Sequence, residues 1–260
     1  MNEGIEGIIF EYGRNQICYH NNIVNMNRNV VLVGGLSFNI MSLPYTKDLI
    51  KFCNLNKLGL YIPQFRSHPN YGIYRFEDDL EDFNDLLKLI NGKIIAIGNS
   101  TGCQVIMKTI KSVNKIVLCI LQGPVSDVEY EEHVNPNLKD QLKIAEESKG
   151  VLPFKHEHNF ITSERFISLF KRNVTEDMFS SYLDDDFYIN LNPRCIRCVF
   201  VVSKRDEYTV KSNVEKLKKV KNSVCHVLEE GDHFLTNLKS INEFMKIIGD
   251  EIFKSINRHI

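Results

Sequence analysis

Short apolar runs alternate with longer segments of mixed polarity along this chain. The apolar runs lie at residues 29–37, 93–100, 115–127, 196–207 and, more weakly, 223–233. Segments between them, such as 76–90, carry apolar residues at three- and four-residue spacing, which is typical of helices that bury one side. Strands alternating with helices predict crossover units and a mostly parallel central sheet that is buried on both faces. We therefore expect an α/β fold flanked by helices.

Two regions depart from this alternation. The segment "GIIFEYGRNQICYH" (7–20) has the pattern of a strand pair at the edge of the sheet. Residues 129–190 contain no strand-like apolar run, and we interpret them as a helical cap inserted between two strands. We expect one domain over residues 1–260 that includes this insertion.

The segment "KIIAIGNSTGCQVIMKTI" (93–110) joins a predicted buried strand directly to a predicted helix. Ser100 stands at the junction, with Gly98 and Gly102 two residues to either side. In a G-x-S-x-G turn of this kind the serine adopts a strained backbone, and the glycines allow the strand and helix to approach closely. This context favours a nucleophilic serine over an ordinary turn.

A nucleophilic serine needs a base to accept its proton and an acid to orient that base. In a strand-turn-helix hydrolase the chain order is serine, acid, histidine. Asp206 follows the predicted strand at 196–203, and His233 lies in a glycine-containing turn before the last predicted helix. Asp127, at the end of the strand after the serine's helix, is an alternative acid, although it could also cap the first cap helix.

An oxyanion hole requires backbone N–H groups close to the reacting carbonyl. We expect them at Thr101, directly after the serine, and at Leu36, after the glycine pair Gly34-Gly35. The same glycine pair lacks the third glycine of a dinucleotide fingerprint and the lysine of a nucleotide-binding loop. We expect no organic cofactor.

The segments "GNSTGCQ", "ILQGPVSD" and "SKRDEY" together resemble an α/β-hydrolase family of largely uncharacterised eukaryotic proteins. That family includes the fungal siderophore esterase that acts on fusarinine C. The similarity extends to "VGGLS" and "HPNYGIYRFEDDLEDF" and covers about residues 29–235.

The resemblance implies an α/β-hydrolase fold with Ser100 as nucleophile, Asp206 as acid and His233 as base. Asn99 stands where the family usually has histidine, and Val128 where it usually has arginine. The segment "HPNYG" has also lost the family's serine pair. These departures lie near the expected pocket, so a siderophore ester is an indication of substrate type and no more.

Other clusters of polar residues have ordinary explanations. Cys195 and Cys198 form "CIRC", but a zinc site needs a second pair, so structural thiols are expected and no metal site. The histidines of "KHEHNF" (155–160) are two residues apart, do not share a helix face, and are interpreted as cap surface.

The composition limits the binding partners and the location that we expect for this protein. The net charge is −1, from 32 basic and 33 acidic residues, so no basic surface for nucleic acid is expected. No apolar run is long enough for a membrane span, and the N-terminus lacks a secretory pattern. Seven scattered cysteines fit a reducing, cytoplasmic location.

The sequence thus predicts a serine hydrolase that cleaves an ester of a small or medium-sized molecule through an acyl-enzyme. Two alternatives stay open: an acyltransferase or thioesterase on the same residues, or a hydrolase-fold protein that binds a ligand with little activity. The acyl and alcohol groups, the mobility of the cap and the oligomeric state do not follow from the sequence.

Overall fold

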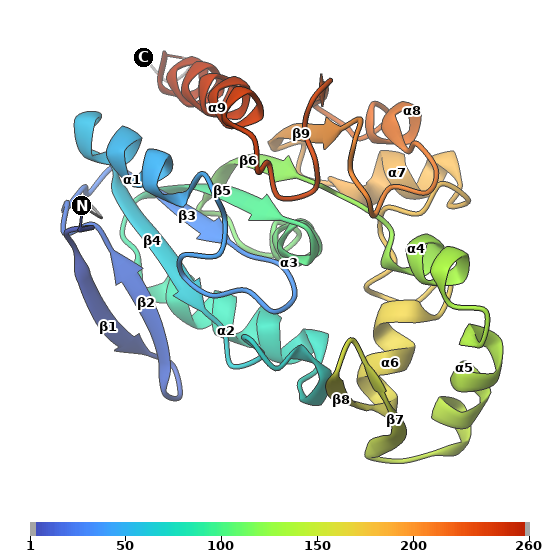
Figure 1. The fold of residues 1–260 in the computed structure, drawn as a ribbon. Coiled ribbons are helices and arrows are strands. Elements are labelled where there is room, and N and C mark those ends of the chain that lie inside the picture. Colours follow the sequence, from blue (N-terminus) through green and yellow to red (C-terminus); the bar gives the residue numbers. More distant parts are fainter. Residues whose placement is uncertain (1–3, 258–260) are drawn as a thin grey trace.

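A computed structural model describes residues 4–257 and shows an eight-stranded sheet in the order β1-β2-β4-β3-β5-β6-β9-β10 (Figure 1). In this order the strands from β4 to β10 pair in parallel, whereas β1 and β2 form an antiparallel hairpin and β2 pairs antiparallel to β4. The predicted mostly parallel sheet is confirmed. Its strands are β1 (Ile8–Tyr12), β2 (Gln16–His20), β3 (Arg28–Val33), β4 (Gly59–Gln64), β5 (Lys93–Asn99), β6 (Ile116–Gln122), β9 (Arg197–Ser203) and β10 (Ser223–Leu228).

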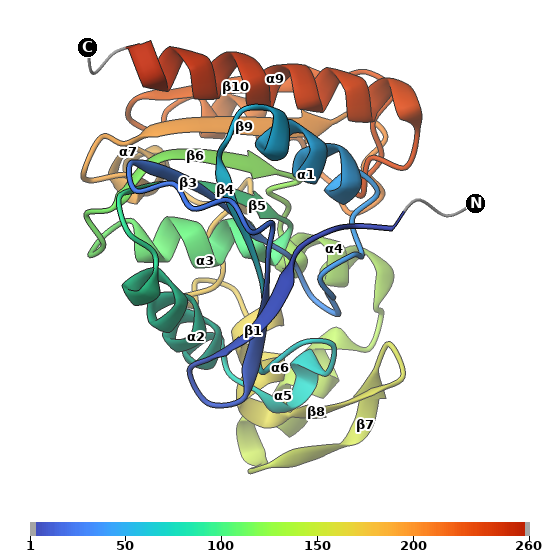
Figure 2. The same ribbon diagram turned by 90° about the vertical axis from the view of Figure 1, so that its left-hand side faces the viewer.

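Helices cover both faces of the sheet (Figure 2). One face packs against α1 and α9 through Leu49, Phe244 and Ile248, and the other against α2 and α3 through Phe83 and Ile106. Burial on both faces explains why the central strands are almost continuously apolar. The helices are α1 (Thr46–Leu55), η1 (Tyr71–Ile73), α2 (Phe76–Leu89), α3 (Thr101–Thr109), α4 (Asp127–Val134), α5 (Leu138–Glu147), α6 (Ser163–Phe170), α7 (Asp185–Leu191), α8 (Val214–Leu217) and α9 (Leu238–Asn257).

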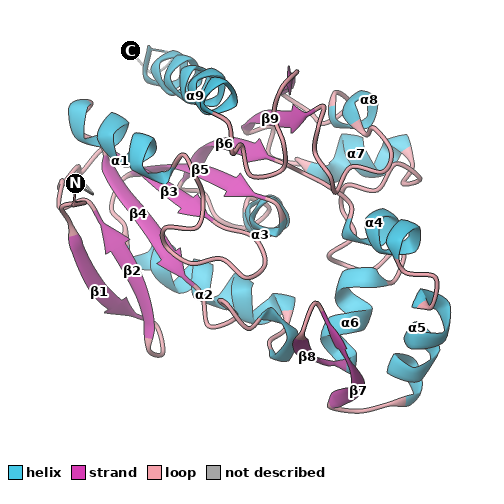
Figure 3. Cartoon of the chain, in the orientation of Figure 1, coloured by secondary structure: helices cyan, strands magenta, loops and turns pink. Residues whose placement is uncertain are grey.

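The inserted segment is not purely helical, and this part of the sequence-based interpretation is wrong. An antiparallel hairpin, β7 (Val151–His156) and β8 (Asn159–Thr162), lies between α5 and α6 (Figure 3). Leu152 is buried and Val151 and Pro153 are exposed, which is the alternation of a half-buried strand. The run carries only a weak strand signal because it is short and contains a proline.

The insertion has a small apolar cluster of its own, formed by α5, α6, the hairpin and η1. Ile161, Phe166 and Tyr71 lie at its centre and are almost fully buried. Farther along the chain, Phe179 and Tyr188 pack into the core on the α2–α3 face of the sheet. The cluster therefore occupies the first part of the 129–190 segment, and the later part belongs to the main core.

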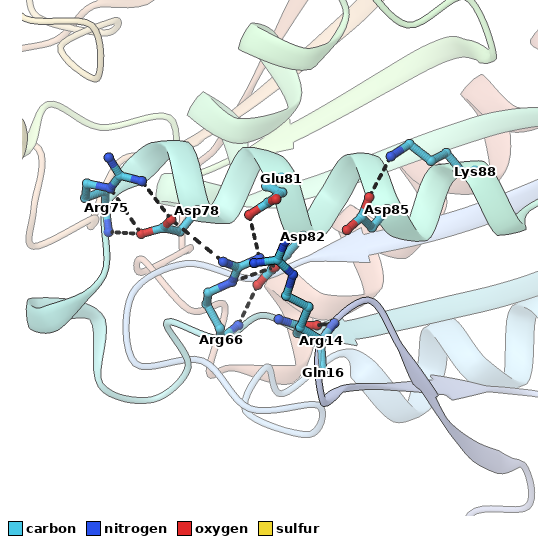
Figure 4. A network of polar contacts seen from close by, with 9 residues as sticks. All are labelled: Arg14, Gln16, Arg66, Arg75, Asp78, Glu81, Asp82, Asp85 and Lys88. Carbon is cyan, nitrogen blue, oxygen red and sulfur yellow. Dashed lines mark hydrogen bonds and ion pairs between the residues drawn. The ribbon is translucent and has the colours of Figure 1, made fainter.

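The loop between β4 and α2 is clamped to the acidic side of α2 (Figure 4). Arg66 donates from its backbone N–H to Asp82 at 2.7 Å and from Nε at 2.8 Å, and its Nη2 lies 2.8 Å from Glu81. Arg75 donates its backbone N–H to Asp78 at 2.8 Å, which closes the other end of the loop. These contacts fix the segment that carries Tyr71 toward the insertion.

Candidate active site

Ser100 stands between β5 and α3 with φ 53° and ψ −126°. A non-glycine residue in this region carries backbone strain, and such strain is concentrated at functional sites. The conformation is that expected for a serine at a sharp strand-to-helix turn.

Glycines around this turn permit contacts that no side chain would allow. A Cβ atom built on Gly102 would lie 2.3 Å from the carbonyl oxygen of Val33, and one on Gly35 would lie 2.7 Å from Cβ of Ser100. The loop after β3 therefore runs directly against the serine. This contact places the backbone of residues 35 and 36 beside the candidate nucleophile.

Asp206 and His233 come from the loops after β9 and β10 and meet at the same edge of the sheet. Nδ1 of His233 lies 2.9 Å from Oδ2 of Asp206. His233 is 2% exposed and Asp206 6% exposed, so water hardly competes for this hydrogen bond. The other carboxylate oxygen of Asp206 accepts the backbone N–H of Tyr208 at 3.0 Å. Both the aspartate and the imidazole orientation are thereby fixed.

Glu207, the residue after the proposed acid, also contacts the histidine loop. Its Oε2 accepts the backbone N–H of His233 at 3.1 Å. Gly123, which follows β6, has φ +63°, and a Cβ built there would lie 3.1 Å from Cε1 of His233. Glu207 and Gly123 therefore hold the histidine loop from two sides.

A buried amide pair connects the serine turn to the histidine loop. Nδ2 of Asn99 donates to Oε1 of Gln122 at 2.7 Å, and Nε2 of Gln122 donates to the carbonyl oxygen of His233 at 2.9 Å. The backbone N–H of Ser100 donates to the carbonyl oxygen of Gln122 at 3.0 Å. Gln122 thus contacts both candidate catalytic segments.

Ser100 and His233 line one cavity of about 160 Å³ beneath the insertion. In the part of the chain that the structure describes, the Ser100 hydroxyl has no hydrogen-bond partner. Contacts between a nucleophile and its base are often loose before substrate binds and tighten in the reacting complex. The structure therefore brings the two residues to a shared cavity without a direct hydrogen bond.

Asp127, the alternative acid, lines this cavity at the start of α4. It accepts from Nε2 of Gln104 at 3.1 Å, whereas Nδ1 of His233 is taken by Asp206. Ser126, rather than Asp127, is the N-cap residue of α4. Burial raises the pKa of Asp127 to about 6, and the nearby imidazole of His233 lowers it only in part.

Leu36 and Thr101, whose backbone N–H groups are the expected oxyanion donors, both lie close to Ser100. Leu36 lines the cavity next to Ser100, and Thr101 begins α3, so its N–H is one of the helix's unpaired terminal donors. Within residues 4–257 neither backbone N–H donates a hydrogen bond.

His156 is a cavity residue, so its interpretation as cap surface is wrong. Its Nδ1 lies 2.7 Å from the hydroxyl of Tyr71 and its Nε2 3.2 Å from Glu131. Burial raises the pKa of Glu131, but hydrogen bonds from His156 and Asn135 outweigh burial, so the pKa lies below the ordinary value. No local pattern in "KHEHNF" signals this, because the contacts depend on how the hairpin packs against η1 and α4.

A buried ion cluster fastens α6 to α2 behind the cavity. Nη1 of Arg165 lies 2.9 and 3.0 Å from the two carboxylate oxygens of Glu176, and Nη2 lies 3.8 Å from Asp79. Burial raises the pKa values of both carboxyls to about 7, although Arg165 opposes the shift. The guanidinium is almost fully buried and balanced by these acids.

The cysteines supply no further chemistry that the geometry supports. Cys195 is exposed, Cys198 is buried, and all seven cysteines are free thiols.

In the described range no group of three His, Cys, Asp or Glu side chains is arranged to hold a metal ion. None of the helices described has the length and apolarity to cross a bilayer.

The sheet order, the strained serine between β5 and α3 and the acid and histidine loops after β9 and β10 define an α/β-hydrolase fold. A family model described as "Protein of unknown function (DUF1749)" matches residues 1–231, so the chain belongs to that family. A search of curated proteins found no significant match.

Solved structures with this fold include characterised hydrolases. The siderophore hydrolase EstB from Aspergillus fumigatus has a TM-score of 0.80 at 16% identity, covering 98% of this chain and 99% of its own. A soluble variant of monoglyceride lipase from Saccharomyces cerevisiae has a TM-score of 0.73 at 10% identity, covering 98% and 96%. Est1E from Butyrivibrio proteoclasticus has a TM-score of 0.68 at 11% identity, covering 97% and 100%. The α/β-hydrolase fold and the resemblance to the siderophore esterase family are thereby confirmed.

Proposed function

We propose that the protein is a serine hydrolase that cleaves an ester of a small or medium-sized molecule. The observation that carries this proposal is the 2.9 Å hydrogen bond between His233 and Asp206 at the wall of the cavity that holds the strained Ser100. An aspartate on Nδ1 selects the tautomer in which Nε2 can accept the serine proton.

In the proposed reaction, His233 deprotonates Ser100, whose Oγ attacks the ester carbonyl carbon. Asp206 stabilises the imidazolium, and the N–H groups of Leu36 and Thr101 bind the oxyanion. The imidazolium then protonates the departing alcohol. Water, deprotonated by the same imidazole, hydrolyses the acyl-enzyme and restores the serine hydroxyl.

The size of the cavity supports an ester with a small group on one side of the scissile bond. Its volume of about 160 Å³ is below the roughly 300–1,000 Å³ of sites that enclose a drug-sized ligand. Two of the structural neighbours act, by their names, on siderophores and on monoglycerides. For such a substrate, we propose that one arm enters the cavity.

We also propose a reducing, cytoplasmic location, which the seven free thiols support.

Steady-state hydrolysis of p-nitrophenyl acetate and butyrate tests the proposal. We expect turnover by the wild type and a loss of about 10³-fold or more in kcat for Ser100→Ala and His233→Asn. Product analysis with added alcohol or thiol separates hydrolysis from acyl transfer. Turnover that survives Ser100→Ala in a pure, folded sample rules the mechanism out.

A further inference from the structure

The cavity around Ser100 is acidic. Its lining includes the carboxylates of Asp127, Glu131 and Glu157 and no lysine or arginine. The nearby buried guanidinium of Arg165 is already balanced by Glu176 and a second carboxylate. A cleft lined by charges of one sign focuses its field and attracts ligands of the opposite sign.

The three carboxylates differ in how many hydrogen bonds they already accept from the protein. Glu131 is 5% exposed and accepts from His156 at 3.2 Å and from Asn135 at 2.6 Å. Asp127 accepts from Gln104 at 3.1 Å. The carboxylate of Glu157 is exposed and makes no hydrogen bond or ion pair with the residues that the structure describes. Glu157 therefore offers the least committed negative charge at the cavity.

Glu157 is placed by the tip of the β7–β8 hairpin. Glu157 and His158 have φ values of 45° and 69°, in the left-handed region that a type I′ hairpin turn requires at both central residues. Such turns favour Asn-Gly, and this chain has Glu-His instead. The hairpin thus carries an acid to the cavity despite the backbone cost.

Aromatic rings complete the wall. The rings of Tyr130 and Tyr208 lie 4.7 Å apart, and Tyr208 lies 4.5 Å from His233. Phe170 and Phe234 line the same space. Aromatic faces attract organic cations, and the attraction grows when water is excluded. Among the described residues these acids do not form a group suited to a bare metal ion.

We propose that the ester accepted by this cavity carries an organic cation, an ammonium group, bound between the tyrosine rings and Glu157. The inference rests on the proposed function, because Ser100 and His233 identify the cavity as a substrate site, while the acids and rings specify what enters it. Three separate elements supply the binding groups: the hairpin tip (Glu157), α4 (Tyr130) and the loop after β9 (Tyr208).

Matched ester pairs test this inference. In one pair, p-nitrophenyl esters have an acyl chain that ends in a trimethylammonium or in an isosteric tert-butyl group. In the other pair, choline butyrate is compared with the ester in which carbon replaces the nitrogen. In at least one pair we expect kcat/KM to favour the cationic ester by about tenfold or more at low salt. The preference should fall several-fold between about 20 mM and 0.5 M salt, because ions screen the attraction.

Glu157→Gln should reduce the cationic-to-neutral ratio by about three- to tenfold. Glu147→Gln, which removes an exposed carboxylate at the end of α5 away from the cavity, should leave the ratio unchanged. Hydrolysis of both esters without a preference, or a preference that survives both Glu157→Gln and high salt, overturns the inference but not the hydrolase. No hydrolysis of either ester, together with no fluorophosphonate labelling of Ser100, overturns both.

Discussion

Gln122 donates a hydrogen bond of 2.9 Å from its side-chain amide to the backbone carbonyl oxygen of His233. The backbone carbonyl oxygen of Gln122 accepts the backbone N–H of Ser100 at 3.0 Å. The residue is fully buried, and Asn99 satisfies its remaining amide oxygen at 2.7 Å. Gln122 therefore couples the position of the proposed base to that of the proposed nucleophile.

Replacement of this amide should impair catalysis beyond its effect on stability. In Gln122→Met the carbonyl of His233 loses its donor, which should cost about 1–3 kcal/mol in the free energy of unfolding. A shift of the imidazole by about 1 Å can lower kcat roughly 10²-fold, and we expect kcat to fall more than KM rises. Asn192→Leu is the control, because Asn192 is also a fully buried amide but bonds residues 196 and 221, which precede β9 and β10, whereas His233 follows the end of β10. Equal kcat per folded molecule in the two variants would contradict the positioning role.

The choice between the two candidate acids can be tested directly. Asp206→Asn should lower kcat by about 10³- to 10⁴-fold, because Asp206 holds Nδ1 of His233. Asp127→Asn should lower kcat less than about tenfold, since Asp127 bonds to Gln104 instead. Single-turnover kinetics of both variants on one ester decides the matter. The opposite ranking would assign the acid to Asp127.

The raised pKa of Asp127 predicts a pH-dependent effect on stability. Burial moves this pKa from 3.8 to about 6, so the folded state binds the proton more tightly than the unfolded state between those values. Stability from this carboxyl is therefore greatest in acid and is lost as the pH rises toward 6. Allowing for its partial exposure, Asp127→Asn should gain about 1–2 kcal/mol at roughly pH 8 and nothing near pH 4. Urea unfolding at both pH values measures the difference, and a gain that does not change with pH argues against this origin.

The buried ion cluster should be needed to hold the insertion on the sheet. Arg165→Met leaves Glu176 and Asp79 buried without a counter-charge and should cost about 3–5 kcal/mol. Arg172→Met provides the matched comparison, because Arg172 pairs with Glu132 on the exposed surface of the same insertion. That loss should be below about 1 kcal/mol in urea unfolding. Similar losses of unfolding free energy in the two variants would show that the buried ion cluster stabilises the protein no more than the exposed ion pair does.

Much of the fold and part of the candidate site could be predicted because their signals are local. The apolar run of β5, the glycines beside Ser100 and the helical spacing of α3 are consecutive in the chain. The chain order of parallel strands then brings the ends of β9 and β10 together, which is why Asp206 and His233 could be paired in advance.

The residues that the sequence did not reveal depend on tertiary packing. His156 and Glu157 reach the cavity through a hairpin whose turn lacks the usual Asn-Gly signal. Asn99 stands where the siderophore esterase family usually has histidine. It donates a hydrogen bond to Gln122, and no sequence pattern indicates this role. Tyr130 becomes a wall residue only because α4 packs beside the loop after β9.

Mass spectrometry of the protein after reaction with a fluorophosphonate tests the central claim most directly, because an activated serine displaces the fluoride and is phosphonylated. The account predicts one adduct, on the peptide that contains Ser100, and its loss in Ser100→Ala. Ser37→Ala, which changes another serine at the cavity, should still be labelled. No adduct on the folded wild type, or an adduct that persists in Ser100→Ala, would contradict the assignment of Ser100 as the nucleophile.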